Sequence, residues 1–338
     1  MQTPEKSRLP AKAKISFWSI VKIIAGILLI AFVFSKASLP EITALVSQVS
    51  WGWLGLTFVL FILLSMLKAW QYHVLFDTDF PYSQILSVVI WQNAISNFVA
   101  SGAGVAAYLT MLRTEQNIKV SRSASVFLIT KVGDLIAIWL GLLLSLVFVW
   151  NQVAPAHTLI LFLIALIGGG LAAFAATVFL RRTFVDILRA ILERTGLLKL
   201  PLTQRLLELA GTLADIEQND LTRIMLTASG LSSFYLILTF AWTYSSLHTF
   251  NLPVTVWVVV FVSSMLQLLS IIPIQVFGGL GVSEAASLYF FGLFGFPQVQ
   301  VAAVVIGLRL LFYLTNLTVL LYLPIHTFFI NPSIKKVK

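Results

Sequence analysis

Long apolar runs separated by short polar stretches dominate the chain. A transmembrane helix needs about 20 consecutive, mostly apolar residues. Runs of this length predict full spans, which we place roughly at residues 15–35, 51–75, 124–150, 156–180, 223–247 and 298–323. The pattern therefore predicts an all-α polytopic membrane protein with about six full spans, in a single transmembrane domain over residues 15–325.

Two further apolar regions, residues 84–112 and 254–292, do not fit single straight spans. The first is too short to cross a bilayer twice at about 20 residues a crossing. Gly102 and Gly104 interrupt it, and Arg113 ends it. We predict a re-entrant helical hairpin there, which enters and leaves the membrane on the same side. The second region is longer, and it is either another hairpin or two tight crossings.

The composition agrees with a membrane protein. Hydrophobic residues make up 59% of the 338 residues, only 10% are charged, and the mean hydropathy is +0.96. A soluble protein carries about a quarter charged residues. The chain has no cysteine, which excludes disulfides, thiolate metal sites and cysteine nucleophiles.

The positive residues indicate the orientation of the chain. They collect at span ends, in the tails 1–14 and 326–338 and in the segment 181–222, whereas the opposite loops hold few. Because cytoplasmic loops are enriched in Lys and Arg, we predict that both termini are cytoplasmic. The net charge of +9 then reflects topology and contact with anionic lipids, not binding of nucleic acid. The segment 181–222 has amphipathic stretches and is expected to lie on the inner leaflet.

A short motif recurs in the two halves of the chain. The pattern Gly-x-Gly-Val begins at Gly102 and again at Gly279, and a span with a cation, Lys131 or Arg309, follows each copy. The order of span, broken hairpin and span runs over about 51–150 and again over about 223–323. The additional span at 156–180 reverses the direction of the second half. The sequence thus predicts an inverted repeat, an architecture of many secondary transporters.

The second glycine motif also precedes an acid. Gly279 and Gly281 allow the backbone to turn at membrane depth, where irregular backbone must be covered by protein or water. Glu284 would then lie in the first turn of a half-helix, where a carboxylate caps free N–H groups. Capping and a functional role both stay open for this acid.

Five ionisable residues fall inside predicted spans or hairpins, where each costs several kcal/mol unless it is paired or hydrated. Lys131 and Asp134 share a helix face and are expected to pair. Lys68 lies near a span end and is expected to snorkel to the interface. Arg309 is mid-span and needs an acid, for which Glu284 is the preferred partner.

Several amides lie at hairpin depth, and they are expected to satisfy backbone groups that the breaks set free. They are Asn93, Asn97, Gln267 and Gln275. The pattern Gly102-x-Gly104-x-x-Ala107 matches a dinucleotide fingerprint, but no strand precedes it and no acid lies about 20 residues further on. Known phosphate, metal and hydrolase motifs are also missing, so no cofactor or metal is expected.

Three stretches carry motifs of a known family. NFVASGAGVAAYLTMLR resembles an Asn-x-x-Pro-Ser-Gly-x-Gly hairpin that ends in Arg, TKVGDLIAIWLG resembles a Glu-Arg-x-x-Asp helix, and PIQVFGGLGVSEAA resembles a Pro…Gly-Gly-x-Gly-x-x-Glu segment. The matching positions are Asn97, Gly102, Gly104, Arg113, Lys131 in the place of Arg, Asp134, Gly279, Gly281, Glu284 and Arg309. On these residues the chain, from about 15 to 325, resembles the lysylphosphatidylglycerol synthase transmembrane region, a flippase-like family of integral membrane proteins.

The first hairpin departs from this family pattern. Ala100 stands where the family often has Pro, Ala106 and Ala107 stand where an acid is common, and Thr130 replaces Glu. The resemblance implies a multi-pass protein of the inner membrane that is linked to lipid translocation. Aminoacyl transfer belongs to a separate soluble domain in two-domain members, so we expect that this chain is not an enzyme.

The leading hypothesis is a carrier that binds the headgroup of a phospholipid or lipid-linked substrate between the two halves. The expected binding residues are Arg113, Lys131 and Arg309 for phosphate, Asp134 and Glu284 to balance them, the half-helix ends near Gly104, Gly279 and Gly281, and the amides of Asn97 and Gln275. Two alternatives stay open: an enzyme with Glu284 or Asp134 as general base, and a scaffold that recruits a soluble enzyme through residues 183–220. A homodimer also stays open.

Overall fold

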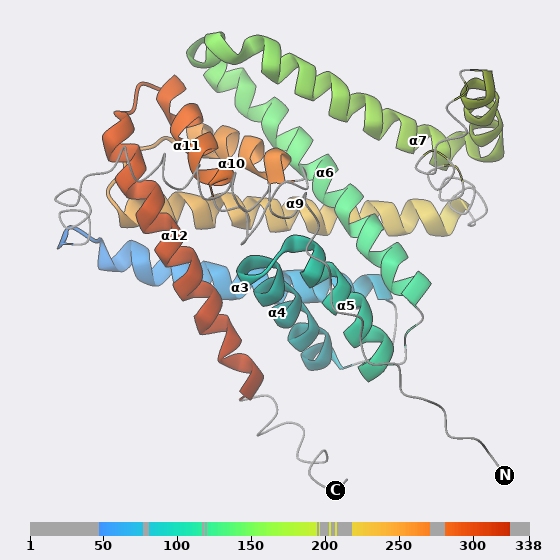
Figure 1. Ribbon diagram of the computed structural model, residues 1–338, viewed down its shortest axis with the longest axis horizontal. Coiled ribbons are helices and arrows are strands. Elements are labelled where there is room, and N and C mark those ends of the chain that lie inside the picture. The colour runs from blue at the N-terminus through green and yellow to red at the C-terminus, as the bar shows by residue number, and fades with distance from the viewer. Residues whose placement is uncertain are drawn as a thin grey trace, which may run out of the picture.

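The computed structural model describes residues 47–76, 81–116, 118, 120–194, 196, 203, 207, 218–270 and 281–324. The elements of this part of the chain are helical (Figure 1). They are α3 (Trp51–Phe76), α4 (Tyr82–Phe98), α5 (Ser101–Gln116), α6 (Val120–Val149), the short 3₁₀ helix η1 (Trp150–Ala156), α7 (His157–Arg194), α9 (Gln218–Thr249), α10 (Val256–Ser270), α11 (Val282–Leu293) and α12 (Gln298–Leu320).

Four stretches of the described chain are long and apolar enough to cross a membrane. They are Trp51–Phe76, Arg122–Ala176, Thr222–Thr249 and Gln298–Pro324. The second stretch contains the predicted span 124–150 and most of the span 156–180. The 3₁₀ helix η1 lies at their junction, where Val153 leaves the helical conformation. The predicted span 15–35 and both terminal tails lie outside the described residues, so six spans and cytoplasmic termini stay predictions.

Helices α3 and α9 form a close antiparallel pair (Figure 1). The hydroxyl groups of Thr57 and Ser245 are 2.9 Å apart, and the Gln71 amide donates to the Ser232 hydroxyl over 2.7 Å. Residue numbers fall along α9 as they rise along α3, which sets the antiparallel direction. Small polar side chains of this kind let membrane helices approach closely and hydrogen-bond across the interface.

A hairpin of two helices follows α3, and another follows α9. Helix α4 follows the C-terminal end of α3 and packs against α3 and α5, whereas α10 follows the C-terminal end of α9 and packs against α9 and α11. Because α3 and α9 are antiparallel, the two hairpins, α4–α5 and α10–α11, begin at opposite ends of the pair (Figure 1).

The turn of the first hairpin lies two residues earlier than its glycines suggested. Helix α4 ends at Phe98 and α5 begins at Ser101, so Gly102 and Gly104 lie in the first turn of α5 instead of interrupting a helix. A Cβ atom on Gly104 would overlap the Ser96 side chain and lie 2.6 Å from the Gln92 carbonyl oxygen. Because Gly104 has no side chain, α5 can approach α4 closely at this position.

The second hairpin is described on both sides of its turn. Residues 271–280, with Gly278, Gly279 and Gln275, lie outside the described residues. Helix α11 begins directly after Gly281, whose φ of +89° is a conformation that glycine adopts without a steric penalty. This observation agrees with the expected glycine turn ahead of Glu284.

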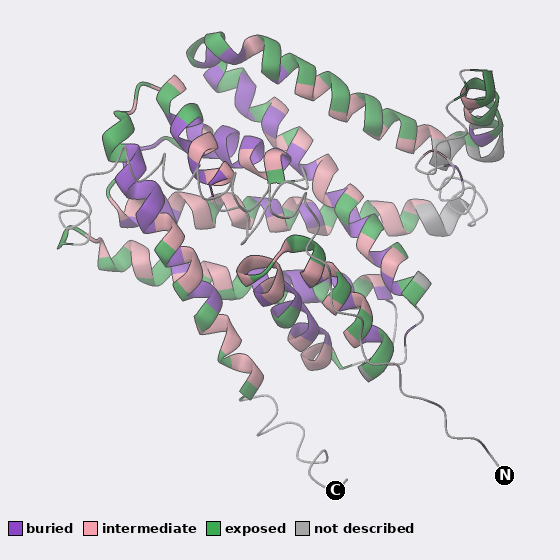
Figure 2. Cartoon of the chain, in the orientation of Figure 1, coloured by how far each residue is buried: buried purple, intermediate pink, exposed green. Residues whose placement is uncertain are grey.

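The helices α6 and α12 follow the two hairpins, and both contribute buried residues to the same apolar core. Helix α6 lies closely against α9 and α10, and buried residues lie in α4, α6, α10 and the first half of α12 (Figure 2). Helix α12 lies against α11 and touches α3, α4 and α9 over shorter stretches (Figure 1). The described core therefore extends from α6 to the first half of α12.

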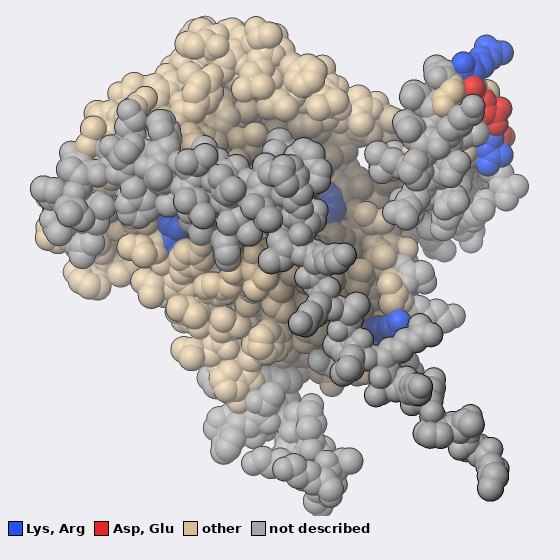
Figure 3. Space-filling view, in the orientation of Figure 1, with Lys and Arg blue, Asp and Glu red and all other residues tan. Residues whose placement is uncertain are grey.

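Helix α7 extends beyond the predicted span end at residue 180. Its helical conformation continues to Arg194, so the first part of the segment 181–222 belongs to this helix instead of to a separate loop. Leu188 and Leu192 pack against Val185 and Leu207 in a small cluster of their own. Figure 3 shows charged side chains gathered at this end of α7, whereas most of the described face in that view is uncharged.

The two glycines at the start of α5 predict different effects of the same substitution. We expect Gly104→Ala to destabilise the protein by about 1–3 kcal/mol, because the overlap involves a backbone carbonyl group that cannot rotate away. Gly102→Ala meets open space and is expected to be neutral or slightly stabilising, since alanine favours a helix. Thermal unfolding of both purified variants in detergent measures the difference, and equal melting temperatures would contradict this account of Gly104.

Candidate functional site

A buried ion pair joins α3 to α6. The Lys68 ammonium group lies 2.9 Å from Oδ2 and 3.0 Å from Oδ1 of Asp134. Lys68 is only 8% exposed, and it also donates to the Gln71 amide oxygen over 2.9 Å. The expectation that Lys68 snorkels to the interface is therefore wrong, because an acid on a neighbouring helix lies within reach of its ammonium group.

Asp134 has two further donors. The Ser232 hydroxyl on α9 donates to Oδ1 over 2.7 Å, and the Lys131 ammonium group lies 3.3 Å from Oδ2. The predicted pairing of Lys131 with Asp134 is confirmed, but the side chain of Lys131 is 53% exposed and its contact is the longer one. Two lysines thus share one carboxylate, which leaves the cluster with one net positive charge.

This charged cluster lines a cavity of about 230 Å³, called here the polar cavity. Its walls come from α3, α4, α6, α9 and α10, and they include Gln92, Asn93, Tyr235, Gln267 and Ser270. The side-chain nitrogen of Gln267 is buried and has no hydrogen-bond partner among the described residues. The cavity therefore combines an excess of positive charge with amide and hydroxyl groups.

A second ion pair joins α11 to α12. The Nε atom of Arg309 lies 3.4 Å from Oε1 of Glu284, which confirms the predicted pairing. The other carboxylate oxygen of Glu284 accepts the Gly281 N–H over 2.6 Å and the Ser283 hydroxyl over 2.9 Å. Glu284 therefore both caps α11 and neutralises Arg309.

The second ion pair lines a cavity of about 250 Å³ between α9, α10, α11 and α12. Gln267 on α10 contributes to the walls of both this cavity and the polar cavity. The two charged clusters therefore flank the same position on α10. In the described parts of the chain, no three His, Asp or Glu side chains are grouped in a way that could hold a metal ion.

The turn of the first hairpin contacts α12 near Arg309. The Asn97 amide donates to the Asn316 side-chain oxygen over 2.8 Å, so Asn97 bonds a side chain and not the freed backbone that was expected. The Phe98 ring stacks on Tyr313 at a centroid distance of 5.5 Å, and the Arg309 guanidinium lies 5.1 Å from the Tyr313 ring centre. Asn97 thus joins the first hairpin to α12 about two turns from Arg309.

The other predicted binding residues lie elsewhere or are not described. Arg113, which was expected to attract the phosphate together with Lys131 and Arg309, is exposed in the last turn of α5 and lines neither of these two cavities. Gly279 and Gln275 lie outside the described residues. The sequence interpretation overlooked Gln71 and Ser232. Gln71 was the available signal, because a second polar residue three positions after Lys68 marks a helix face that points into protein.

The two lysines that share Asp134 are expected to differ in their contribution to stability. Removing one partner of a buried pair costs about 3–5 kcal/mol, whereas an exposed pair contributes about 0–1 kcal/mol. Lys68→Met should therefore lower the melting temperature in detergent clearly more than Lys131→Met. Equal losses for the two variants would contradict the dominant role of Lys68.

A comparison with protein families matches residues 19–319 to the family described as the lysylphosphatidylglycerol synthase TM region. Comparisons with curated proteins and with solved structures give no match. The family match covers both charged clusters and the described helices except for the last residue of α12. It agrees with the resemblance carried by the hairpin motifs. The chain belongs to the lysylphosphatidylglycerol synthase transmembrane-region family.

Proposed function

We propose that the protein binds a lipid headgroup between its two halves and translocates the lipid across the inner membrane. The observation that carries this proposal is the pair of buried charged clusters, each of which lines its own cavity beside Gln267. Membership of a family of membrane proteins related to lipid synthesis supports a lipid as the ligand.

The charges themselves support a headgroup as the ligand. Ionisable groups inside a membrane are costly and usually mark a substrate pathway or a proton relay. Lys68 and Lys131 together exceed Asp134 by one positive charge, and this excess favours a phosphate group. The planar guanidinium of Arg309 is suited to bidentate recognition of phosphate when its contact with Glu284 opens.

We propose further that α3–α6 and α9–α12 form an inverted repeat. The antiparallel direction of α3 and α9 supports this arrangement, as does the start of the two hairpins at opposite ends of that pair. In such repeats, alternating access comes largely from one half rocking against the other around a fixed site.

Translocation of this kind needs no covalent step, and we propose that the chain acts without an enzymatic reaction or a cofactor. Glu284 and Asp134 are each bound by cations and hydroxyl groups, so their role in the proposal is to hold the cations in place. The lipid would leave the site unchanged.

The inverted repeat predicts opposite exposure of the two hairpin ends. The chain has no natural cysteine, so single cysteines can be labelled without background. Thr114→Cys at the end of α5 and Thr255→Cys before α10 should react with a membrane-impermeant maleimide from opposite sides of the membrane, because both positions are exposed. Labelling of both positions from the same side would overturn the inverted arrangement.

The second ion pair is expected to be essential for translocation. We expect Glu284→Gln and Arg309→Ala to lower the translocation of a fluorescent phospholipid in proteoliposomes by about tenfold or more, because each removes a charge from a buried pair. Glu284→Gln keeps an oxygen that can accept the Gly281 N–H, so the cap of α11 is retained.

A matched control is Glu193→Gln, which makes the same change at an exposed position of α7 and should translocate lipid like the wild type. The melting temperature of each variant tests folding separately from transport. Wild-type translocation by both ion-pair variants would rule out a role of Glu284 and Arg309.

A further inference from the structure

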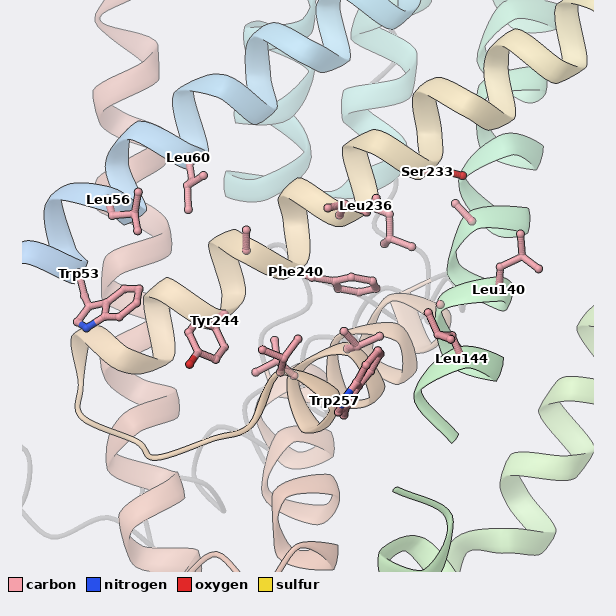
Figure 4. Close-up of a pocket in the computed structure, with 17 residues that line it drawn as sticks. Trp53, Leu56, Leu60, Leu140, Leu144, Ser233, Leu236, Phe240, Tyr244 and Trp257 are labelled. Atoms are coloured by element: carbon pink, nitrogen blue, oxygen red, sulfur yellow. The ribbon is translucent and has the colours of Figure 1, made fainter. Parts of the chain in front are cut away.

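A large apolar groove lies on the α6 side of the antiparallel pair. It has a volume of about 660 Å³, and its walls come from α3, α6, α9 and α10 (Figure 4). In the close-up, Trp53 and Leu56 reach it from α3, Leu140 and Leu144 lie across from them on α6, and Trp257 approaches from α10. Several of these side chains, such as Leu140 and Leu144, are exposed, so the groove is open to the surrounding lipid.

The groove and the polar cavity lie end to end along the same four helices. On α3 and α10 the groove residues and the polar-cavity residues occupy separate stretches, whereas on α6 and α9 the two stretches overlap where they meet. The groove is lined by residues 53–60 of α3, 137–144 of α6, 233–244 of α9 and 256–260 of α10. The polar cavity is lined on the same helices by residues 68–72, 131–138, 232–236 and 267–270. Leu236 contributes to both walls, so the two spaces are neighbours.

The length of the groove is that of one lipid leaflet. Its lining on α9 runs from Ser233 to Tyr244. At 1.5 Å of rise per residue this stretch is about 16 Å long, close to half of a hydrocarbon core of about 30 Å. The groove therefore suits a single chain that extends over one leaflet.

We propose that the groove holds one acyl chain of the lipid whose headgroup occupies the polar cavity. This inference rests on the proposed function, and it adds the placement of the chain and the leaflet of origin. The acyl chain runs from Lys68 toward the Trp53 end of α3. A lipid in this direction comes from the leaflet at the Phe76 end of α3, because its headgroup faces that end.

The contribution of the groove is positional. Lipid tails are as apolar as leucine side chains, so moving a chain from the bilayer into the groove gains little from the hydrophobic effect. Packing along the groove instead aligns the chain, and the alignment holds the phosphate beside Lys68 and Lys131. Headgroup and chain then bind as one unit.

Trp257 provides a natural probe of the groove. The full-length protein in detergent is titrated with phosphatidylglycerol that carries bromine atoms on its acyl chains, which quench tryptophan fluorescence on contact. The difference in quenching between the wild type and Trp257→Phe measures contact of the brominated chain with the groove. This difference should saturate as the lipid concentration rises. Absence of a saturable difference would overturn the proposal.

Two variants fill the groove, and one control does not. Ala241→Phe and Leu140→Phe add bulk at exposed lining positions and should weaken this saturable binding by about tenfold, the scale on which a pocket rejects a group that does not fit. Ala165→Phe makes the matched change at an exposed position of α7 and should bind like the wild type. Unchanged binding by both groove variants would also overturn the proposal.

A probe without a phosphate tests the link between headgroup and chain. Brominated diacylglycerol should bind the groove about tenfold more weakly than the brominated phospholipid, and equal binding would refute the coupling. Translocation in proteoliposomes is measured separately. Translocation without Trp257 quenching would overturn the groove alone, whereas saturable quenching without translocation would retain the groove and remove the proposed transport.

Discussion

The carboxylate of Asp134 connects three helices, and the arrangement of the described chain depends on it. It accepts the Lys68 ammonium group from α3, the Ser232 hydroxyl from α9 and the Lys131 ammonium group from its own helix α6. An ionised acid is tolerated inside a membrane only where donors of this kind surround it. The contact also crosses between the proposed halves, since α3 and α6 precede the long helix α7, whereas α9 follows it.

Close backbone approach makes this contact possible. A Cβ atom on Gly133 would lie 3.0 Å from the Ser232 hydroxyl and 3.1 Å from the Ala228 carbonyl group. The residue beside Asp134 therefore has no side chain, and α6 can lie directly on α9 at the depth of the carboxylate. A small residue next to a buried charge is the feature that sets the distance between the two halves.

The two charged clusters differ in a way that suits different tasks. The Asp134 cluster has one net positive charge and lies deep in the close packing of α3, α6 and α9. The Glu284–Arg309 pair is neutral and joins α11 to α12. In the proposed transport, the first cluster holds an anionic headgroup, and the Glu284–Arg309 contact opens and closes. The apolar groove beside the first cluster gives the lipid its direction.

Local patterns in the sequence predicted the helices and two of the ion contacts. Hydropathy indicated the spans because each must be long and apolar, and the three-residue spacing of Lys131 and Asp134 predicted their pairing. The cost of a mid-span Arg309 predicted an acid partner, and Glu284 is that partner. Lys68 and Asp134 are 66 residues apart, and Asn97 and Asn316 are 219 apart. The sequence alone determined that such buried polar groups need partners, whereas only the packing of the helices decided which residues meet, because no local spacing records a contact between distant helices.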